Sequence, residues 1–204
     1  MSKKKYDPME QWYERKSSLM AEMLGKEHNV VMHALIPYYI GGSLDLYYYA
    51  KGIPGTAVAT KELSEVSGEG SSNRVFKNYE FVMFTKRRLN LKAAERESTP
   101  FGKVLSTMNA ILNCLAPYSA EAKLNPGDTC EFPVDMEELG GRCLIFDGYP
   151  TYSKKKAEFG LMAIIEIFRS EMEFARKHTG AELLARLREE GFYPYTDLDR
   201  EAVA

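Results

Sequence analysis

The chain lacks the motifs by which many enzymes are recognised. It contains only 3 histidines and 3 cysteines among 204 residues. The phosphate-binding patterns GxxxxGK and GxGxxG do not occur in it, and neither does the nucleophile pattern GxSxG. No reaction class therefore follows from a local motif, and any chemistry depends on side chains that the fold brings together.

The cysteines are few, and their spacing excludes the common metal and disulfide patterns. Cys114, Cys130 and Cys143 are odd in number and far apart, and no CxxC pair is present. Such usage predicts reduced thiols and a cytoplasmic chain rather than a disulfide-stapled, secreted one. We expect Cys114 and Cys143 to be small core residues.

Long apolar segments and an excess of one charge are also missing. No apolar run reaches about 18 residues, the length that predicts a membrane span, and the lysine-rich N-terminus has no signal-peptide core. The formal net charge is −2, whereas nucleic-acid binders usually carry a basic excess. The short basic runs at residues 3–5, 86–88 and 154–156 predict solvated loops. We therefore expect neither a membrane nor a nucleic acid as partner.

What the chain does contain is an ordinary globular composition. Apolar residues make up 45% and charged residues 27%, close to the averages for globular domains. A domain of this length buries roughly 70% of its unfolded surface, so the core needs no disulfide or metal. We predict one domain over residues 1–204, with an N-terminal helix in residues 1–27 and a core in residues 28–204.

The N-terminal half predicts a helix followed by strands. Asp7 and Pro8 are typical of a helix start, and Gly25 is typical of a helix end. Apolar or alternating segments then predict four strands joined as an antiparallel meander. A stretch rich in glycine and serine, residues 64–73, predicts a flexible hairpin loop before the fourth strand. The four strands are expected at residues 28–36, 44–49, 55–63 and 79–85.

The C-terminal half predicts helices around three further strands. Thr99 and Pro100 open the most regular apolar helix pattern, which we expect to end at Pro117. Ser170 and Thr179 each stand three residues before a glutamate, which predicts two successive helix starts. The strands are expected at residues 129–132, 142–147 and 159–168. The whole order predicts an α+β fold with a mostly antiparallel or mixed β-sheet and flanking helices.

The polar residues leave two interpretations of the chemistry open. His28 and His33 are expected on opposite faces of one strand, so they cannot share a metal ion from that strand. No metal or cofactor is predicted. Asp45, Asp128 and Asp147 lie near turns or strand ends. Such carboxylates either pair in space for acid–base or magnesium chemistry or cap their own turns, and we favour capping.

Two residues near the C-terminus are expected to have structural roles. His178 should lie near a helix C-terminus, where a charged imidazole is favourable. Arg200 ends the sequence TDLDR, and its guanidinium can form a bidentate pair with a nearby carboxylate. We expect this pair to fix the C-terminal tail.

Several stretches, taken in order, are similar to one known family. They are LDLYY at residues 44–48, YEFVMF at residues 79–84, LAPY at residues 115–118, NPGD at residues 125–128, and the apolar strand and helical tail of residues 159–200. In order and spacing they resemble the Suppressor of fused (SUFU) domain family over roughly residues 30–203.

This resemblance implies a mixed α/β domain with no recognised enzymatic activity and no cofactor. The animal relative binds Gli transcription factors, and bacterial members associated with polymorphic toxin systems look like immunity proteins. The length of 204 residues fits the single-domain bacterial kind. The resemblance therefore implies a protein that binds another protein, with a toxin domain as the expected partner. The oligomeric state is left open.

The resemblance also implies candidate binding residues. A tyrosine in the Leu-Ala-x-Tyr stretch and an aspartate in the following Gly-Asp turn contact a partner peptide in the animal relative, and these positions correspond to Tyr118 and Asp128. Asp147, after the strand sequence LIF, is expected near the same cleft. The alternative for Tyr118 is a helix-end residue whose ring packs on the sheet.

Two other classes of function remain as alternatives. The first is a hydrolase that uses Asp45, Asp128 and Asp147, with or without a metal ion. The second is a sensor of a small ligand. The interpretation we favour is a non-enzymatic binding protein.

Overall fold

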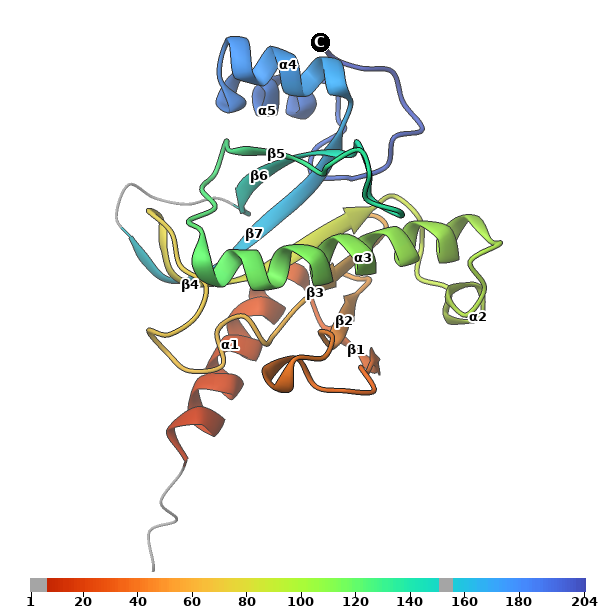
Figure 1. Ribbon diagram of the computed structural model, residues 1–204. Helices are drawn as coiled ribbons and strands as arrows, with labels where there is room; N and C mark the ends of the chain where they lie inside the picture. Colours follow the sequence, from red (N-terminus) through yellow and green to blue (C-terminus); the bar gives the residue numbers. More distant parts are fainter. Residues whose placement is uncertain (1–6, 151–155) are drawn as a thin grey trace, which may run out of the picture.

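The computed structural model describes residues 7–150 and 156–204. A seven-stranded mixed β-sheet forms its centre, and helices lie on both faces of this sheet (Figure 1). The prediction of an α+β fold is thus confirmed. The basic run at residues 3–5 and the first part of the run at 154–156 lie outside the described residues, whereas residues 86–88 form a loop as expected. Within the described residues, no helix combines the length and the apolar character that a membrane span requires.

Strands and helices follow one another in groups along the chain. The helical segments are α1 (Pro8–Leu24), the 3-10 turn η1 (Tyr38–Ile40), α2 (Leu91–Ala94), α3 (Pro100–Glu121), α4 (Arg169–Lys177) and α5 (Gly180–Glu189). The strands are β1 (Glu27–Met32), β2 (Leu46–Tyr49), β3 (Thr56–Ala59), β4 (Phe76–Thr85), β5 (Thr129–Glu131), β6 (Cys143–Tyr149) and β7 (Ala157–Ile167).

The sheet has the strand order β1-β2-β3-β4-β7-β6-β5. Strands β1 to β4 form the predicted antiparallel meander. The chain then crosses over, so that β7 pairs with β4 in parallel, and β6 and β5 continue the sheet antiparallel. As a result, β1 and β5 are the two edge strands and lie at opposite sides of the molecule.

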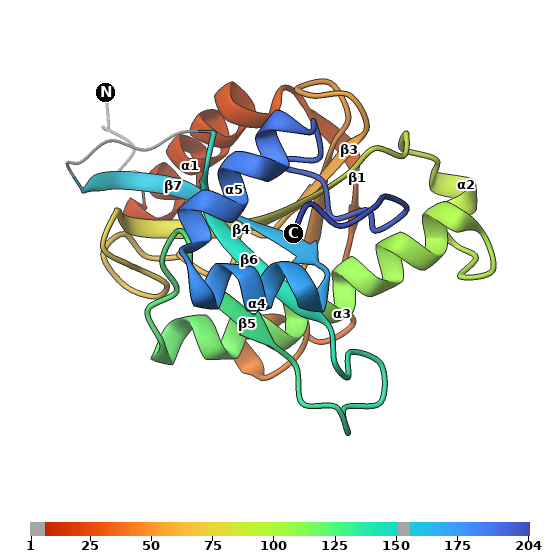
Figure 2. The same ribbon diagram turned by 90° about the horizontal axis from the view of Figure 1, so that it is seen from above.

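Three layers enclose the core (Figures 1 and 2). Because side chains alternate along a strand, each strand supplies apolar residues to both faces of the sheet. The face with Phe81, Met83 and Phe146 packs under the apolar stripe of α3. The opposite face packs under α1 in the region of β2 to β4, and under α4 and α5 in the region of β6 and β7.

Two helix boundaries show where local signals succeed and fail. Helix α1 begins as predicted, because the Asp7 carboxylate accepts a hydrogen bond from the backbone N–H of Met9 at 3.0 Å. Helix α3, however, does not end at Pro117 but continues to Glu121. Ser119 is buried in the last turn, and Ala116 is buried just before the proline. We infer that packing of the helix against the sheet outweighs the loss of one backbone hydrogen bond at the proline.

The first predicted strand is too long. Strand β1 ends at Met32, and the apolar segment that follows it, residues 33–36, leaves the sheet. Leu35 and Ile36 are exposed instead of buried. Apolar character alone therefore predicted a strand where the structure has a loop, and this loop is considered again below.

The stretch at residues 64–73 belongs to the predicted loop between β3 and β4, but only residues 65–70 are exposed, and both of its ends are anchored inside the protein. Ser64, Ser71 and Asn73 are buried. The Ser71 N–H donates to the Leu63 carbonyl at 2.9 Å, and the Asn73 side chain donates to the Leu124 carbonyl at 2.9 Å. Polar residues are held here because their hydrogen bonds are satisfied inside the protein.

The two C-terminal helices have different N-terminal caps. Thr179 caps α5 as predicted, since its hydroxyl accepts a hydrogen bond from the Glu182 N–H at 3.1 Å. Ser170 does not cap α4, which already begins at Arg169. Instead, the Glu171 carboxylate accepts a hydrogen bond from the Phe168 N–H at 2.9 Å.

The predicted role of Arg200 is confirmed. Its guanidinium donates two hydrogen bonds to the buried carboxylate of Glu171, at 2.6 Å and 2.8 Å. The same carboxylate accepts a hydrogen bond from the Val203 N–H at 2.9 Å. The tail is therefore fastened to α4 by a bidentate ion pair.

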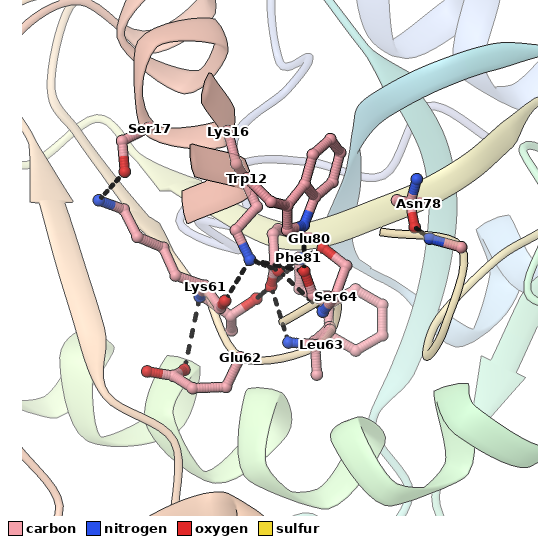
Figure 3. A network of polar contacts seen from close by, with 12 residues as sticks. Trp12, Lys16, Ser17, Lys61, Glu62, Leu63, Ser64, Asn78, Glu80 and Phe81 are labelled. Carbon is pink, nitrogen blue, oxygen red and sulfur yellow. Dashed lines mark hydrogen bonds and ion pairs between the residues drawn. The ribbon is translucent and has the colours of Figure 1, made fainter. Parts of the chain in front are cut away.

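A buried ion pair joins α1 to the sheet (Figure 3). The Lys16 ammonium donates to a Glu80 carboxylate oxygen at 2.9 Å, and both side chains are almost completely removed from solvent. Lys16 also donates to the carbonyls of Lys61 and Ser64. Glu80 accepts further hydrogen bonds from the segment before β4, including those from the N–H groups of Leu63 and Ser64. This network holds α1, the β3–β4 connection and β4 in one arrangement.

Candidate partner-binding groove

A groove of about 830 Å³ lies between the C-terminal half of α3 and the edge strand β5. We call it the β5 groove. Its walls are formed by α3, the turn that leads into β5, strand β5 itself and the segment that follows β5, together with Phe146 of β6. Its lining residues are Cys114, Leu115, Tyr118, Ala122, Lys123, Leu124, Gly127, Asp128, Thr129, Cys130, Glu131, Phe132, Pro133, Met136 and Phe146.

Tyr118 is positioned on this groove by the last turns of α3. Its side chain is 52% exposed, although Ala116 and Ser119 beside it are buried. The alternative, a helix-end residue whose ring packs on the sheet, would bury more of Tyr118 than the structure shows. A half-exposed tyrosine offers an apolar ring and a polar hydroxyl to an incoming molecule.

Asp128 lies across the groove in the turn before β5. One of its carboxylate oxygens, Oδ2, accepts hydrogen bonds from the backbone N–H of Asn125 at 2.8 Å and from the Asn125 side chain at 3.2 Å. Asp128 therefore caps its own turn, as predicted. Within residues 7–150 and 156–204, no hydrogen bond reaches Oδ1. This oxygen can accept a hydrogen bond from a partner while the other oxygen keeps the turn in place.

Glu131, the other carboxylate that lines the groove, is neutralised by two arginines of α4. Glu131 on β5 binds Arg169 at 2.6 Å and Arg176 at 3.7 Å, both from α4. These pairs join β5 to α4. The side chains of Lys123 and Asp128 then remain as the charged groups of opposite sign on the walls of the groove.

Asp147 does not lie at this groove, contrary to the prediction. Its neighbour Phe146 lines the groove, and because side chains alternate along β6, Asp147 faces the opposite side of the sheet. There it is buried and forms an ion pair with Arg188 of α5. Burial raises its pKa, and the Arg188 guanidinium lowers it in part. Asp147 therefore fastens α5 to β6 and is shielded from a partner at the β5 groove.

The carboxylates that the hydrolase alternative requires do not converge. Asp45 precedes β2, where it binds His33 at 2.7 Å and the Ala34 N–H at 2.8 Å. Asp128 lies at the opposite edge of the sheet, and Asp147 lies on the other face. Among the described residues, no group of three or more His, Cys, Asp or Glu side chains is arranged to hold a metal ion. The cluster that the hydrolase alternative requires is thus not formed among these residues.

The thiols of the groove are poorly suited to nucleophilic chemistry. Cys114 and Cys130 both line it, and Cys143 lies nearby on β6. Burial raises the pKa of all three thiols, and a thiol with a raised pKa is seldom ionised near neutral pH. None of the lining residues is a histidine. The predicted core position is correct for Cys143, whereas Cys114 is partly exposed.

Several groove residues were not predicted as binding residues. Lys123, Phe132 and Met136 contribute to its walls beside the two predicted residues. They come from segments whose sequences carry only turn and strand signals. The groove depends on the crossover that brings β5 beside α3, and no local pattern encodes this arrangement.

The fold can be compared with solved structures. The crystal structure of a Sufu–Fu complex matches 96% of this chain and 92% of its own chain, with 14% identity and a TM-score of 0.57. A putative SUFU homologue from Neisseria gonorrhoeae matches 95% of this chain and 98% of its own, with 12% identity and a TM-score of 0.54. Drosophila Suppressor of Fused matches 83% of this chain and 46% of its own, with 18% identity and a TM-score of 0.51.

The chain therefore has the Suppressor of fused fold, as its motifs predicted. No family model matches the sequence, and no curated protein matches it either. At 12–18% identity the likeness is one of architecture.

Proposed function

We propose that this protein is a non-enzymatic binding domain that holds a partner protein in the β5 groove. The observation that carries the proposal is the meeting of Tyr118 and Asp128, from different segments, on the walls of one open groove. An exposed phenol ring beside apolar walls is the kind of group that anchors a protein partner, and a carboxylate oxygen adds selectivity for that partner. A structure of the same fold has been determined as a Sufu–Fu complex, so the architecture is known in a protein complex.

We further propose that the partner is a toxin domain and that binding neutralises it. Support for this step comes from the resemblance to bacterial SUFU proteins and from the match to the Neisseria gonorrhoeae homologue over nearly its whole length. Tyr118 would anchor the contact by burying its ring, and Asp128 would accept a hydrogen bond from a donor on the toxin. The groove needs no reacting group for this function.

The first experiment is capture of the partner from the native host. The tagged wild-type chain and the variants Tyr118→Ala and Asp128→Asn serve as baits, and Tyr13→Ala is the matched control because Tyr13 is an exposed tyrosine on α1, away from the β5 groove. We expect the wild type and Tyr13→Ala to retain one protein that the two groove variants retain at least tenfold less. Equal retention by all four baits would contradict the role of the groove.

The second experiment separates an inhibitor from an enzyme. Toxin domains encoded beside the gene are produced, and their activity is measured at increasing ratios of this chain to toxin. A binding protein removes activity in proportion to its amount and reaches completion near equal ratio. Loss of toxin activity at a small fraction of that ratio would indicate turnover, and an unchanged activity at every ratio would remove the toxin as partner.

A further inference from the structure

A second candidate surface lies near the other edge of the sheet. The segment between β1 and β2, residues 33–43, forms a compact projection that we call the apolar knob. It lies at the far end of the molecule from α4 and α5 (Figure 1). Four large apolar side chains are exposed on it, with fractions of 104% for Leu35, 57% for Ile36, 70% for Tyr39 and 64% for Ile40. Exposed apolar side chains are normal singly, but four within six residues indicate a contact surface.

The knob is held in a defined shape before any partner arrives. The N–H groups of residues 40–43 donate hydrogen bonds to the carbonyls of residues 36–38. The N–H of Leu44 donates to the Asn113 side chain at 2.7 Å, which ties the base of the knob to α3. A surface that is already ordered loses little conformational freedom when it binds. The exposure of these side chains is therefore built into the fold.

The knob carries almost no charge. Between residues 29 and 50, Asp45 is the only acidic residue, and lysine and arginine are missing. The Asp45 carboxylate is already hydrogen-bonded to the His33 ring at 2.7 Å and to the Ala34 N–H at 2.8 Å. A basic or acidic partner would find no complementary group here, and an anionic membrane would find no lysine or arginine. In a two-fold contact, a patch with charges of only one sign would repel its own copy, so an uncharged patch suits contact with a second copy.

The shape of the region also fits contact with a second copy. A hollow of about 520 Å³ adjoins the knob and is lined by Met32, Leu35, Ile36, Gly42 and Asn109, among others. Projection and hollow belong to the same segment, so a two-fold axis can place the projection of each copy against the hollow of the other. None of the residues that line the hollow also lines the β5 groove.

The exposed area is sufficient for a small dimer contact. Taking roughly 150–200 Å² for each large side chain, the four residues expose on the order of 500 Å². Two copies that meet through them would bury on the order of 1,000 Å², which is the lower bound for a specific interface. The contact is therefore expected to be weak and reversible rather than permanent.

The strand edge of β1 is not the surface that pairs. The register of β1 with β2 shifts between Glu27 and Val31, which marks an irregularity in the strand. The N–H of Val30 donates to Nδ1 of His28 at 3.0 Å and is not available to an incoming strand. Irregular edges of this kind prevent strand addition. We therefore expect contact at this end of the molecule to use the side chains of the knob.

We propose that the apolar knob is a homodimer contact, in which a second copy of this chain docks about a two-fold axis. Sedimentation velocity of the full chain from low to high micromolar concentration tests this. We expect a reversible monomer–dimer equilibrium for the wild type. Leu35→Glu and Tyr39→Glu should each raise the dissociation constant at least tenfold, because each places two like charges in the contact.

Matched controls keep this test independent of folding. Leu35 is fully exposed, so Leu35→Glu should unfold in urea like the wild type. Val134→Glu changes an exposed apolar residue elsewhere and should leave the dimer intact. A mixture of Leu35→Glu with Leu35→Lys should recover dimers that neither variant forms alone. A wild-type monomer at all concentrations would overturn the proposal, and so would a dimer that the knob variants leave unchanged.

One further experiment distinguishes binding of the knob to a membrane from binding to a second copy of the chain. The wild type and Leu35→Glu are mixed with neutral phosphatidylcholine vesicles and sedimented. We expect both to stay in the supernatant. Sedimentation of the wild type alone would assign the knob to a lipid surface and overturn the dimer.

Discussion

Replacement of Lys16 by methionine is expected to destabilise the protein strongly. The Lys16 side chain is 1% exposed and that of Glu80 is 0% exposed, so neither charge has access to bulk water. In Lys16→Met, Glu80 keeps its backbone and hydroxyl donors but loses the positive charge at 2.9 Å, and the Lys61 carbonyl loses its donor. Removal of one partner from a buried pair typically costs about 3–5 kcal/mol.

The magnitude can be separated into a charge part and a packing part. Methionine fills nearly the volume of the lysine stem, so the loss should come mainly from the unpaired carboxylate. Glu80→Gln should cost a similar amount, because it leaves the Lys16 ammonium buried without its counter-charge. In the double variant Lys16→Met with Glu80→Gln neither charge remains. We therefore expect its loss to be smaller than the sum of the single losses by about 1–3 kcal/mol.

Urea unfolding followed by circular dichroism measures these differences. Lys26→Met is the matched control, since Lys26 is an exposed lysine just after α1 and should change the free energy of unfolding by less than about 0.5 kcal/mol. The explanation would be refuted by a Lys16→Met loss as small as that of the control. Strict additivity of the two single variants would show that the residues do not act as a pair.

Three further predictions concern titration, the tail and packing. Burial, and to a smaller extent the charge of Glu80, raise the pKa of Glu62 from 4.5 to about 8. Between these two pH values the folded state holds a proton that the unfolded state has lost, so stability should fall as the pH rises from 4.5 to about 8. Glu62→Gln should therefore stabilise the protein at pH 8.5 by more than about 1 kcal/mol and change it little at pH 4.5, as urea titrations at both pH values will measure. Arg200→Met should cost about 3 kcal/mol, because it leaves the Glu171 carboxylate buried without its partner, and hydrogen exchange at the C-terminus should accelerate. Gly160→Ala should lower the thermal midpoint, since a Cβ there would lie 2.1 Å from the Phe76 ring and overpacking costs about 1–3 kcal/mol.

Each of these predictions has an outcome that contradicts it. An equal effect of Glu62→Gln at both pH values would show that the carboxyl does not titrate in the window assigned to it. A full rescue of the tail by Arg200→Lys would show that charge suffices and that the bidentate geometry is unimportant. An unchanged midpoint for Gly160→Ala would show that the Phe76 ring moves aside without cost.

The sequence predicted those features that depend on residues close together in the chain. The cap at Thr179, the start of α1 at Asp7 and the meander of β1 to β4 all follow from local patterns, and the structure confirms them. The family motifs added the Suppressor of fused fold, which the structural comparisons support. The sequence predicted that Arg200 pairs with a carboxylate, but it did not identify Glu171 as the partner.

Features that depend on distant residues were missed for a physical reason. Glu80 lies within the apolar sequence YEFVMF, and its partner Lys16 comes 64 residues earlier, so no local window contains both. Asp147 was expected near the groove because it follows the strand sequence LIF, and the last residue of that sequence, Phe146, does line the groove. A change of one position along a strand moves a side chain to the other face, and sequence proximity could not distinguish the two.

The two proposed surfaces follow from the same property of the sheet. An open sheet has two edge strands. Each of them is covered by another element, is made irregular, or is used to bind a partner. At the β5 edge, a three-residue strand adjoins the open β5 groove, to which Tyr118 and Asp128 contribute. At the β1 edge, an irregular strand ends in an apolar knob whose side chains project into solvent. Because the surfaces share no lining residue, a dimer formed through the knob leaves both β5 grooves open. If both proposals hold, the dimer presents two binding sites to its partner.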